Sequence, residues 1–297
     1  MTIGFVEVSP RDGLQNEKTL LSVADKLELI DRAVRAGAKR IEVASFVNPK
    51  RVPQMAGAEE LIAALPAYPG VETIGLVLNE RGVERALATN VHELGLVVAA
   101  SDDFAVANQG MSAEDTVAMA EAMLVRCAAA GRPAQVTITT SFACPFAGPT
   151  DPVRVVEIAR RLAAAGPREV AIADTIGVAR PEEVSALIAA VVQVIAPLPV
   201  RAHFHDTRGM GVANALAAVA AGASVLDASI AGIGGCPFAP GAAGNVASED
   251  LAYAFGDAAL GLDMEALIDT AEWLGERLGR SQCSAQVRAR RASRSPS

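Results

Sequence analysis

Short apolar segments that suit β-strands alternate with longer Ala- and Leu-rich segments of helical patterning along nearly the whole chain. Several helical segments end in a Gly-containing turn, as at Ala36-Gly37-Ala38 and Ala221-Gly222-Ala223, which is typical of a helix C-cap. This alternation predicts a parallel sheet covered by helices. The predicted strands are Ile3–Val8, Arg40–Ser45, Thr73–Leu78, Glu93–Val98, Ala134–Thr140, Glu169–Asp174, Val200–His205 and Val225–Ile230. The predicted helices include Leu21–Ala36, Ala58–Leu65, Ala113–Ala130, Pro152–Ala165, Pro181–Ile195 and Val212–Ala221.

Eight strand-then-helix units in about 250 residues match a closed (β/α)₈ barrel in both count and length. A doubly wound open sheet is the alternative, because periodicity alone does not show that a sheet closes. No low-complexity linker interrupts the pattern, so we expect one barrel domain over residues 1–280. Leu267–Leu278 is expected to add a C-terminal helix. Residues 281–297, which end in the basic sequence RARRASRSPS, are expected to form a disordered tail.

Composition narrows the class of protein. The 297 residues carry 26 Lys+Arg and 34 Asp+Glu, a formal net charge of −8, which argues against a nucleic-acid binder or a protein of anionic membrane surfaces. The apolar runs are too short to span a bilayer, and the N-terminus lacks the pattern of a signal peptide. The four cysteines are widely spaced, with no C-x-x-C pair, which favours a reducing compartment. We therefore expect a cytoplasmic protein that binds neither nucleic acid nor membrane.

The candidate metal-binding and catalytic residues lie near the ends of predicted strands. His203 and His205 lie two residues apart on a predicted strand, so they share a face and offer two nitrogen ligands to a metal ion. Two core histidines satisfied by backbone carbonyls are the alternative. Arg201 shares this face and requires an internal carboxylate that the sequence does not identify. Asp12 follows the first strand and could supply an oxygen ligand across the barrel mouth, with Arg11 beside it as a cation that stabilises an oxyanion; an ordinary Asp-Gly turn is the alternative.

Two further carboxylates lie in or at the end of apolar strands. Glu42 interrupts Ile41-Glu42-Val43, and a buried charge of this kind requires a partner or a function. It could act directly in catalysis or support another catalytic group. Asp174 ends the sixth predicted strand, where it could also simply cap the following loop.

The segment Ala231–Gly244 contains five glycines and two prolines and is predicted to be a mobile lid loop after the eighth strand. It carries Cys236, a candidate proton donor or nucleophile, for which a buried structural thiol is the alternative. Asn245 follows and offers a neutral oxygen ligand. A mixed set of nitrogen and oxygen ligands with open positions suits Mg²⁺ or Mn²⁺ best, and Zn²⁺ or Co²⁺ less well.

Several of these segments, in this order, resemble one family. The chain is similar to hydroxymethylglutaryl-CoA lyases from about residue 3 to about residue 280. The matching segments are Arg11-Asp12-Gly13-Leu14-Gln15-Asn16-Glu17, Ser45-Phe46-Val47-Asn48-Pro49-Lys50 with Val52-Pro53-Gln54-Met55, Asp174-Thr175-Ile176-Gly177, His203-Phe204-His205-Asp206-Thr207, and Gly234-Gly235-Cys236-Pro237-Phe238-Ala239 through Gly244-Asn245.

The resemblance implies a metal-dependent TIM barrel that cleaves 3-hydroxy-3-methylglutaryl-CoA to acetyl-CoA and acetoacetate, and we expect a homo-oligomer, a dimer. It implies that the divalent cation, Mg²⁺ or Mn²⁺, is held by Asp12, His203, His205 and Asn245. Arg11 is expected to stabilise the thioester enolate and Cys236 to protonate it. Further residues expected in or around the site are Glu42, Asp174 and Glu249, with Asp174 as the candidate base for the tertiary hydroxyl. The expected contacts to the acyl-CoA substrate are Gln15, Ser45 and Arg208.

The chain departs from the family pattern at two positions. Arg208 stands where the family usually has Tyr, and Ala171 stands where it often has a small hydroxyl residue. Both changes are expected to touch the acyl pocket. Arg208 could bind a substrate carboxylate or CoA phosphate, or it could neutralise an acid such as Asp206. Two other functions compete with lyase chemistry: a Claisen-condensing acyl transferase of the isopropylmalate synthase type, and a barrel that only binds CoA esters.

Overall fold

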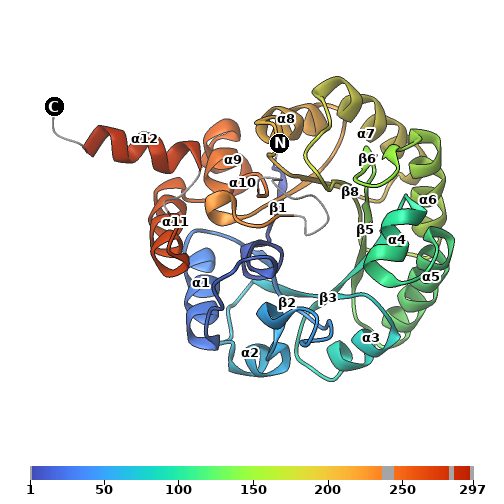
Figure 1. The fold of residues 1–297 in the computed structure, drawn as a ribbon, viewed down its shortest axis with the longest axis horizontal. Helices are drawn as coiled ribbons and strands as arrows, with labels where there is room; N and C mark the ends of the chain where they lie inside the picture. Colours follow the sequence, from blue (N-terminus) through green and yellow to red (C-terminus); the bar gives the residue numbers. More distant parts are fainter. Residues whose placement is uncertain (1, 236–243, 281–283, 295–297) are drawn as a thin grey trace.

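The computed structural model describes residues 2–235, 244–280 and 284–294. In this part of the chain, eight parallel strands close into a barrel in the order β1-β10-β9-β8-β5-β4-β3-β2 (Figure 1). The strands are β1 (Gly4–Glu7), β2 (Arg40–Ser45), β3 (Glu72–Val77), β4 (Glu93–Ala99), β5 (Ala134–Thr139), β8 (Val170–Asp174), β9 (Val200–Phe204) and β10 (Val225–Ala228). A short antiparallel pair, β6 (Ala143–Cys144) and β7 (Gly148–Pro149), follows β5. The prediction of a closed barrel is confirmed, and the open-sheet alternative is wrong.

Helices surround the barrel and cover the outer faces of its strands (Figure 1). Many begin at positions that the sequence marks. The Ser22 hydroxyl accepts a hydrogen bond from the amide of Asp25, and Pro152 and Pro181 each occupy a first helical position. The helices are α1 (Val23–Arg35), α2 (Ala58–Ala64), α3 (Glu80–Leu87), α4 (Asp102–Gln109), α5 (Ala113–Ala129), α6 (Pro152–Ala164), α7 (Pro181–Ile195), α8 (Gly211–Ala220), α9 (Ser248–Phe255), α10 (Asp257–Leu260), α11 (Met264–Leu278) and α12 (Ala285–Arg294). The expected extra C-terminal helix is α11.

The main apolar core lies between the strands and the helices, and the barrel interior holds buried charged side chains as well as a small apolar cluster. Arg40, at the start of β2, donates to Glu93 and Glu169 at 2.8 Å each. Both carboxylates are almost fully buried, so these ion pairs lie inside the barrel at the amino ends of its strands. Arg201 on β9 lies 3.5 Å from Glu169 and 3.2 Å from Asp227 on β10. These two acids are the internal partners that the sequence required for Arg201 and did not identify.

The expected disordered tail is corrected in part by the structure, since Ala285–Arg294 forms α12, which projects from the side of the barrel (Figure 1). Asp250 caps its first turn by accepting from the amides of Ala285 and Gln286 at 3.0 Å. Arg290 pairs with acids of α11, including Asp269 at 2.6 Å. An Arg- and Ser-rich segment is ordered here because its partners are supplied by helices elsewhere in the sequence. The remaining tail residues, 281–283 and 295–297, lie outside the described residues.

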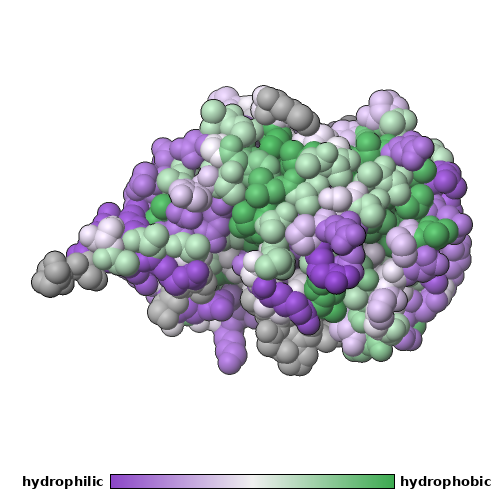
Figure 2. All heavy atoms as spheres, turned by 90° about the horizontal axis from the view of Figure 1, so that it is seen from above, coloured by the Kyte–Doolittle hydropathy of each residue, from purple (hydrophilic) through white to green (hydrophobic). Residues whose placement is uncertain are grey.

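The outer surface has an apolar region over α7 and α8. Figure 2 shows that hydrophobic residues gather on this side of the barrel, and Met210 and Leu216 are both substantially exposed there. None of the helices in the described part of the chain combines the length and apolar character needed to cross a bilayer.

Candidate active site

The site lies at the carboxyl ends of the barrel strands, where TIM-barrel enzymes carry their catalytic groups. A cavity of about 710 Å³ opens there. Its ionisable lining residues come from separate strands and loops, and they include Arg11, Asp12, Glu42, Arg51, Arg201, His203, His205 and Asp227. The folding of the barrel therefore brings together most of the polar residues that the sequence analysis selected.

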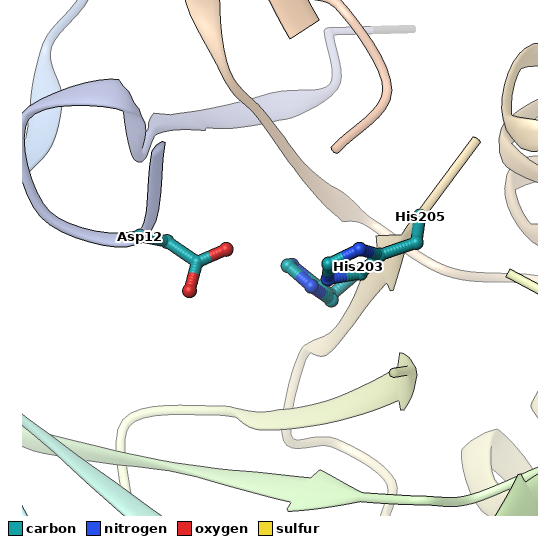
Figure 3. Close-up of side chains that lie close together, drawn as sticks. All are labelled: Asp12, His203 and His205. Carbon is teal, nitrogen blue, oxygen red and sulfur yellow. The ribbon is translucent and has the colours of Figure 1, made fainter. Parts of the chain in front are cut away.

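Asp12, His203 and His205 form one cluster in this cavity. Asp12 belongs to the π-helical turn Ser9–Gly13 after β1, whereas the two histidines lie at the end of β9. Figure 3 shows the carboxylate of Asp12 directed toward the two imidazole rings. A candidate ligand atom from each of the three residues lies within 4.8 Å of the other two. The predicted approach of Asp12 to the histidine pair across β10 is therefore confirmed as a juxtaposition.

Two members of the cluster, His203 and Asp12, are oriented by further groups. His203 Nδ1 lies 2.7 Å from Asp227 Oδ1, which leaves Nε2 as its ligand nitrogen. Burial alone would lower the pKa of His203, but the charge of Asp227 and this hydrogen bond raise it above its usual value. Burial alone would raise the pKa of Asp12, but Arg11, the two histidines and Asn245 together lower it to about 2. Asp12 is therefore ionised at neutral pH, as a metal ligand must be.

Asn245 lies beside the cluster, as expected. Its Nδ2 donates to Asp12 Oδ2 at 2.8 Å and to the carbonyl of Ile233 at 3.1 Å. Its Oδ1 is buried and has no hydrogen-bond partner in the described residues. A buried oxygen without a partner costs free energy unless a ligand satisfies it. One carboxylate, two imidazoles and this carbonyl oxygen together fit a divalent cation in donor chemistry.

Arg11 joins the cluster to Glu42. Its guanidinium donates to Asp12 at 2.7 Å and to Glu42 at 2.7 Å. Glu42 is almost fully buried on β2 and lines the cavity. The charge that the sequence analysis found unexplained in an apolar strand thus has Arg11 as its partner. This arrangement keeps a permanently charged group at the cavity wall, where negative charge that forms on a substrate would be stabilised.

Asp174 and Glu249 do not line this cavity. Both oxygens of Asp174 accept from backbone amides, those of Val178 at 3.1 Å and Ala179 at 2.9 Å. Asp174 is absent from the cavity lining, whereas its neighbours Ala173 and Thr175 are part of it. This geometry favours the capping alternative over the expected role as a base.

Glu249 is fully buried at the start of α9 and accepts from the amide of Ala231, and burial raises its pKa to about 8.

Of the three expected substrate contacts, only Gln15 is among the described residues that line the cavity. Gln15 lines the cavity, and its Oε1 is a buried atom without a partner among the described residues. Ser45 is fully buried and does not line the cavity. Arg208 is exposed, donates to the carbonyl of Gly177 at 3.1 Å and does not line the cavity. Ala171 is fully buried in β8 and is likewise absent from the lining. The expectation that Arg208 and Ala171 reach the acyl pocket is therefore not supported by their positions.

Cys236 and residues 237–243 of the predicted lid lie outside the described residues.

Asp227 is a site residue that the sequence analysis did not identify. Its signal was available, because a carboxylate in the apolar segment Val225-Leu226-Asp227-Ala228 is the same kind of feature that identified Glu42.

Comparison with known proteins places the geometry among acyl-CoA lyases. The HMGL-like family model matches residues 2–274. The 3-hydroxy-3-isohexenylglutaryl-CoA/hydroxymethylglutaryl-CoA lyase of Pseudomonas aeruginosa is 42% identical over 97% of this chain and 96% of its own length. The (R)-citramalyl-CoA lyase of Chloroflexus aurantiacus is 40% identical over 94% of this chain and 92% of its own.

A solved structure agrees with these sequence matches. The HMG-CoA lyase of Acinetobacter baumannii, in complex with coenzyme A and 3-methylmalate, has a TM-score of 0.92 at 35% identity. The match covers 97% of this chain and 95% of that structure. Lyase chemistry on carbon–carbon bonds is thus the activity that these relatives share.

Proposed function

The chain belongs to the HMGL-like family, and on that premise we propose that it cleaves 3-hydroxy-3-methylglutaryl-CoA, or a close 3-hydroxyacyl-CoA analogue, to acetyl-CoA and acetoacetate or the corresponding 3-keto acid. The observation that carries the proposal is the Asp12–His203–His205 cluster with Arg11 beside it in a cavity at the barrel mouth. We propose Mg²⁺ or Mn²⁺ as the cation, because the set mixes nitrogen and oxygen donors.

The reaction breaks the C2–C3 bond after the C3 hydroxyl loses its proton. A divalent cation held by Asp12, His203, His205 and Asn245 would lower the pKa of that hydroxyl. Among the described residues, the carboxylates and imidazoles that line the cavity, and so are the candidate proton acceptors, are those of Asp12, Glu42, Asp227 and the two histidines. Asp174 is not assigned this role, because backbone amides occupy both of its oxygens.

Bond cleavage leaves the electron pair on the thioester fragment as an enolate, and C3 becomes the carbonyl of the keto acid. Arg11 is the permanent cation at the cavity wall, and Glu42 fixes its position through a 2.7 Å contact. We propose that Arg11 stabilises the enolate oxygen and that the Cys236 thiol then protonates C2 to give acetyl-CoA. Removing Arg11 should therefore lower kcat more than it raises KM.

Substrate identity is tested by a panel of acyl-CoA thioesters assayed by mass spectrometry with Mg²⁺ or Mn²⁺. The panel contains 3-hydroxy-3-methylglutaryl-CoA, 3-hydroxy-3-isohexenylglutaryl-CoA and citramalyl-CoA. We expect the first to give acetyl-CoA and acetoacetate, and chelation to abolish turnover. Asp12→Asn and His203→Ala should each lose Mn²⁺ binding while the fold survives. Near-normal turnover after chelation would contradict the metal site, and turnover of citramalyl-CoA alone would contradict 3-hydroxy-3-methylglutaryl-CoA as the substrate.

Selectivity for lyase over condensing activity is tested in the same assay. An isopropylmalate synthase type of enzyme would consume acetyl-CoA and a 2-keto acid to give free CoA. We expect no such consumption when acetyl-CoA and a 2-keto acid are supplied together.

The expected dimer stays a prediction, and we propose the apolar surface over α7 and α8 as its interface.

A further inference from the structure

Three arginine side chains line the cavity, and their surroundings differ. Arg11 and Arg201 are mostly buried and are paired with cavity carboxylates at 2.7 to 3.2 Å. Arg51 is exposed at the outer part of the same wall, and its side chain pairs with no acid in the described part of the chain. The undescribed stretches 236–243, 281–283 and 295–297 contain no Asp or Glu. Arg51 is therefore a cation of the cavity wall that no acidic side chain neutralises.

The backbone that carries Arg51 is fixed at the barrel mouth. The segment follows β2, which ends at Ser45, so it lies on the same side of the barrel as the metal-ligand cluster. The Asn48 carbonyl accepts from the amides of Arg51 at 2.9 Å and Val52 at 3.1 Å, and the Asn48 side chain accepts from the amide of Lys50 at 3.0 Å. A turn held in this way presents the guanidinium from a defined position.

The cavity lining outside the inner cluster lacks carboxylates. In the described lining, the only acids are Asp12, Glu42 and Asp227, and all three belong to the inner cluster. The outer wall carries carboxamides instead, among them Asn48 and Gln109. A wall without carboxylates that carries one cation with no acidic partner attracts a negatively charged group, whereas the inner cluster attracts a cation.

We propose that Arg51 binds an anionic group of the acyl-CoA substrate at the outer end of the cavity. This inference rests on the proposed function, because the substrate must extend from the inner cluster to Arg51. An acyl-CoA offers two sources of such an anion: the distal carboxylate of a dicarboxylic acyl chain and the phosphates of CoA. A guanidinium recognises both through paired, charge-assisted hydrogen bonds.

The test measures binding, so it does not depend on turnover. Glutaryl-CoA and butyryl-CoA differ by a distal carboxylate and lack the C3 hydroxyl that cleavage requires. CoA and 3′-dephospho-CoA differ by one phosphate. Titration calorimetry with these four ligands is performed on the wild-type protein and on Arg51→Gln, Arg51→Lys and Lys50→Gln, in the presence of Mn²⁺. Lys50→Gln is the matched control, because it removes a neighbouring exposed charge that does not line the cavity.

If Arg51 binds the carboxylate, Arg51→Gln should weaken glutaryl-CoA about tenfold or more, the effect of one charge-assisted contact, and leave the other three ligands unchanged. If it binds the 3′-phosphate, every ligand except 3′-dephospho-CoA should weaken. If it binds the diphosphate, all four should weaken. Arg51→Lys should restore part of the loss.

Equal affinities of Arg51→Gln and Lys50→Gln for all four ligands would overturn the proposal. Wild-type protein that cleaves 3-hydroxy-3-methylglutaryl-CoA and yet shows this equality would retain the proposed function and lose only the role of Arg51. A wild-type protein without lyase turnover that still shows the Arg51-dependent affinities would retain the anion site and lose the proposed substrate.

Discussion

His203 Nδ1 lies 2.7 Å from Asp227 Oδ1, and the other oxygen of that carboxylate lies 3.2 Å from Arg201 Nε. Asp227 therefore holds the imidazole ring from one side while an arginine holds Asp227 from the other. A carboxylate in this position fixes which nitrogen of the ring faces the cavity. The ligand geometry at the barrel mouth thus depends on a residue that is itself no ligand of the proposed cation.

We expect Asp227→Asn to weaken Mn²⁺ binding about 10- to 100-fold, the usual cost of losing an outer partner of a metal-binding histidine. Titration calorimetry or electron paramagnetic resonance of Mn²⁺ would measure the affinity directly. Asp103→Asn, at an exposed position on α4, is the matched control. Unchanged Mn²⁺ affinity in Asp227→Asn would show that His203 is positioned by packing alone.

We expect the stability of the fold to depend on pH because of the raised pKa of Glu249. Its folded-state pKa is raised to about 8 by burial, above the ordinary glutamate pKa of 4.5 that applies in the unfolded chain. Below pH 4.5 this carboxyl is protonated in both the folded and the unfolded chain, so it does not lower stability. As pH rises from 4.5 toward 8, the unfolded chain loses the proton more readily than the folded one, and the free energy of unfolding falls progressively. Glu249→Gln removes this titration, so its thermal stability should fall less than that of the wild type between pH 5 and 8.

The magnitude should reach the order of a few kcal/mol at alkaline pH, since each pKa unit is worth about 1.4 kcal/mol. Differential scanning calorimetry across this range measures the effect. Parallel curves for the wild type and Glu249→Gln would mean that Glu249 is ionised in the folded protein at neutral pH.

Cys236 is predicted to act in catalysis rather than in binding. Cys236→Ser should lower kcat by about 10²- to 10⁴-fold, the usual cost of losing a general acid, with little change in KM. Thiol alkylation should inactivate the enzyme, and bound substrate should protect it. Cys127 and Cys144 are buried, so Cys283→Ser is the control that separates the two remaining thiols. Full activity of protein alkylated at Cys236 would remove its proposed role.

Arg208 is predicted to act through the loop after β8. Its guanidinium donates to the carbonyl of Gly177 and lies outside the cavity lining. Arg208→Tyr should therefore lower the thermal midpoint by a few degrees, since loss of one charge-assisted hydrogen bond at an exposed position costs about 1 kcal/mol. The ratios of kcat/KM across the acyl-CoA panel should stay constant. A change in those ratios would instead support the substrate contact expected from the sequence.

Local rules of sequence determined much of this protein. The alternation of strand and helix patterns set eight barrel units, because each segment carries its own periodicity and caps. The two-residue period of a strand places His203 and His205 on one face. The acid and cation after the first strand, Asp12 and Arg11, are identifiable for a different reason: they directly follow a short apolar run.

The tertiary structure alone decided which distant groups meet. Only barrel closure places β10 between β1 and β9, and so brings Asp12 to the histidines and Asp227 to both His203 and Arg201. The Asp174 side chain accepts hydrogen bonds from the backbone of its own loop. The path of the chain after the strand decides this orientation, and the residue type alone does not reveal it. The ordering of α12 likewise depends on acids of α11. Pairings between residues far apart in the sequence carry no local pattern, so only the folded barrel specifies them.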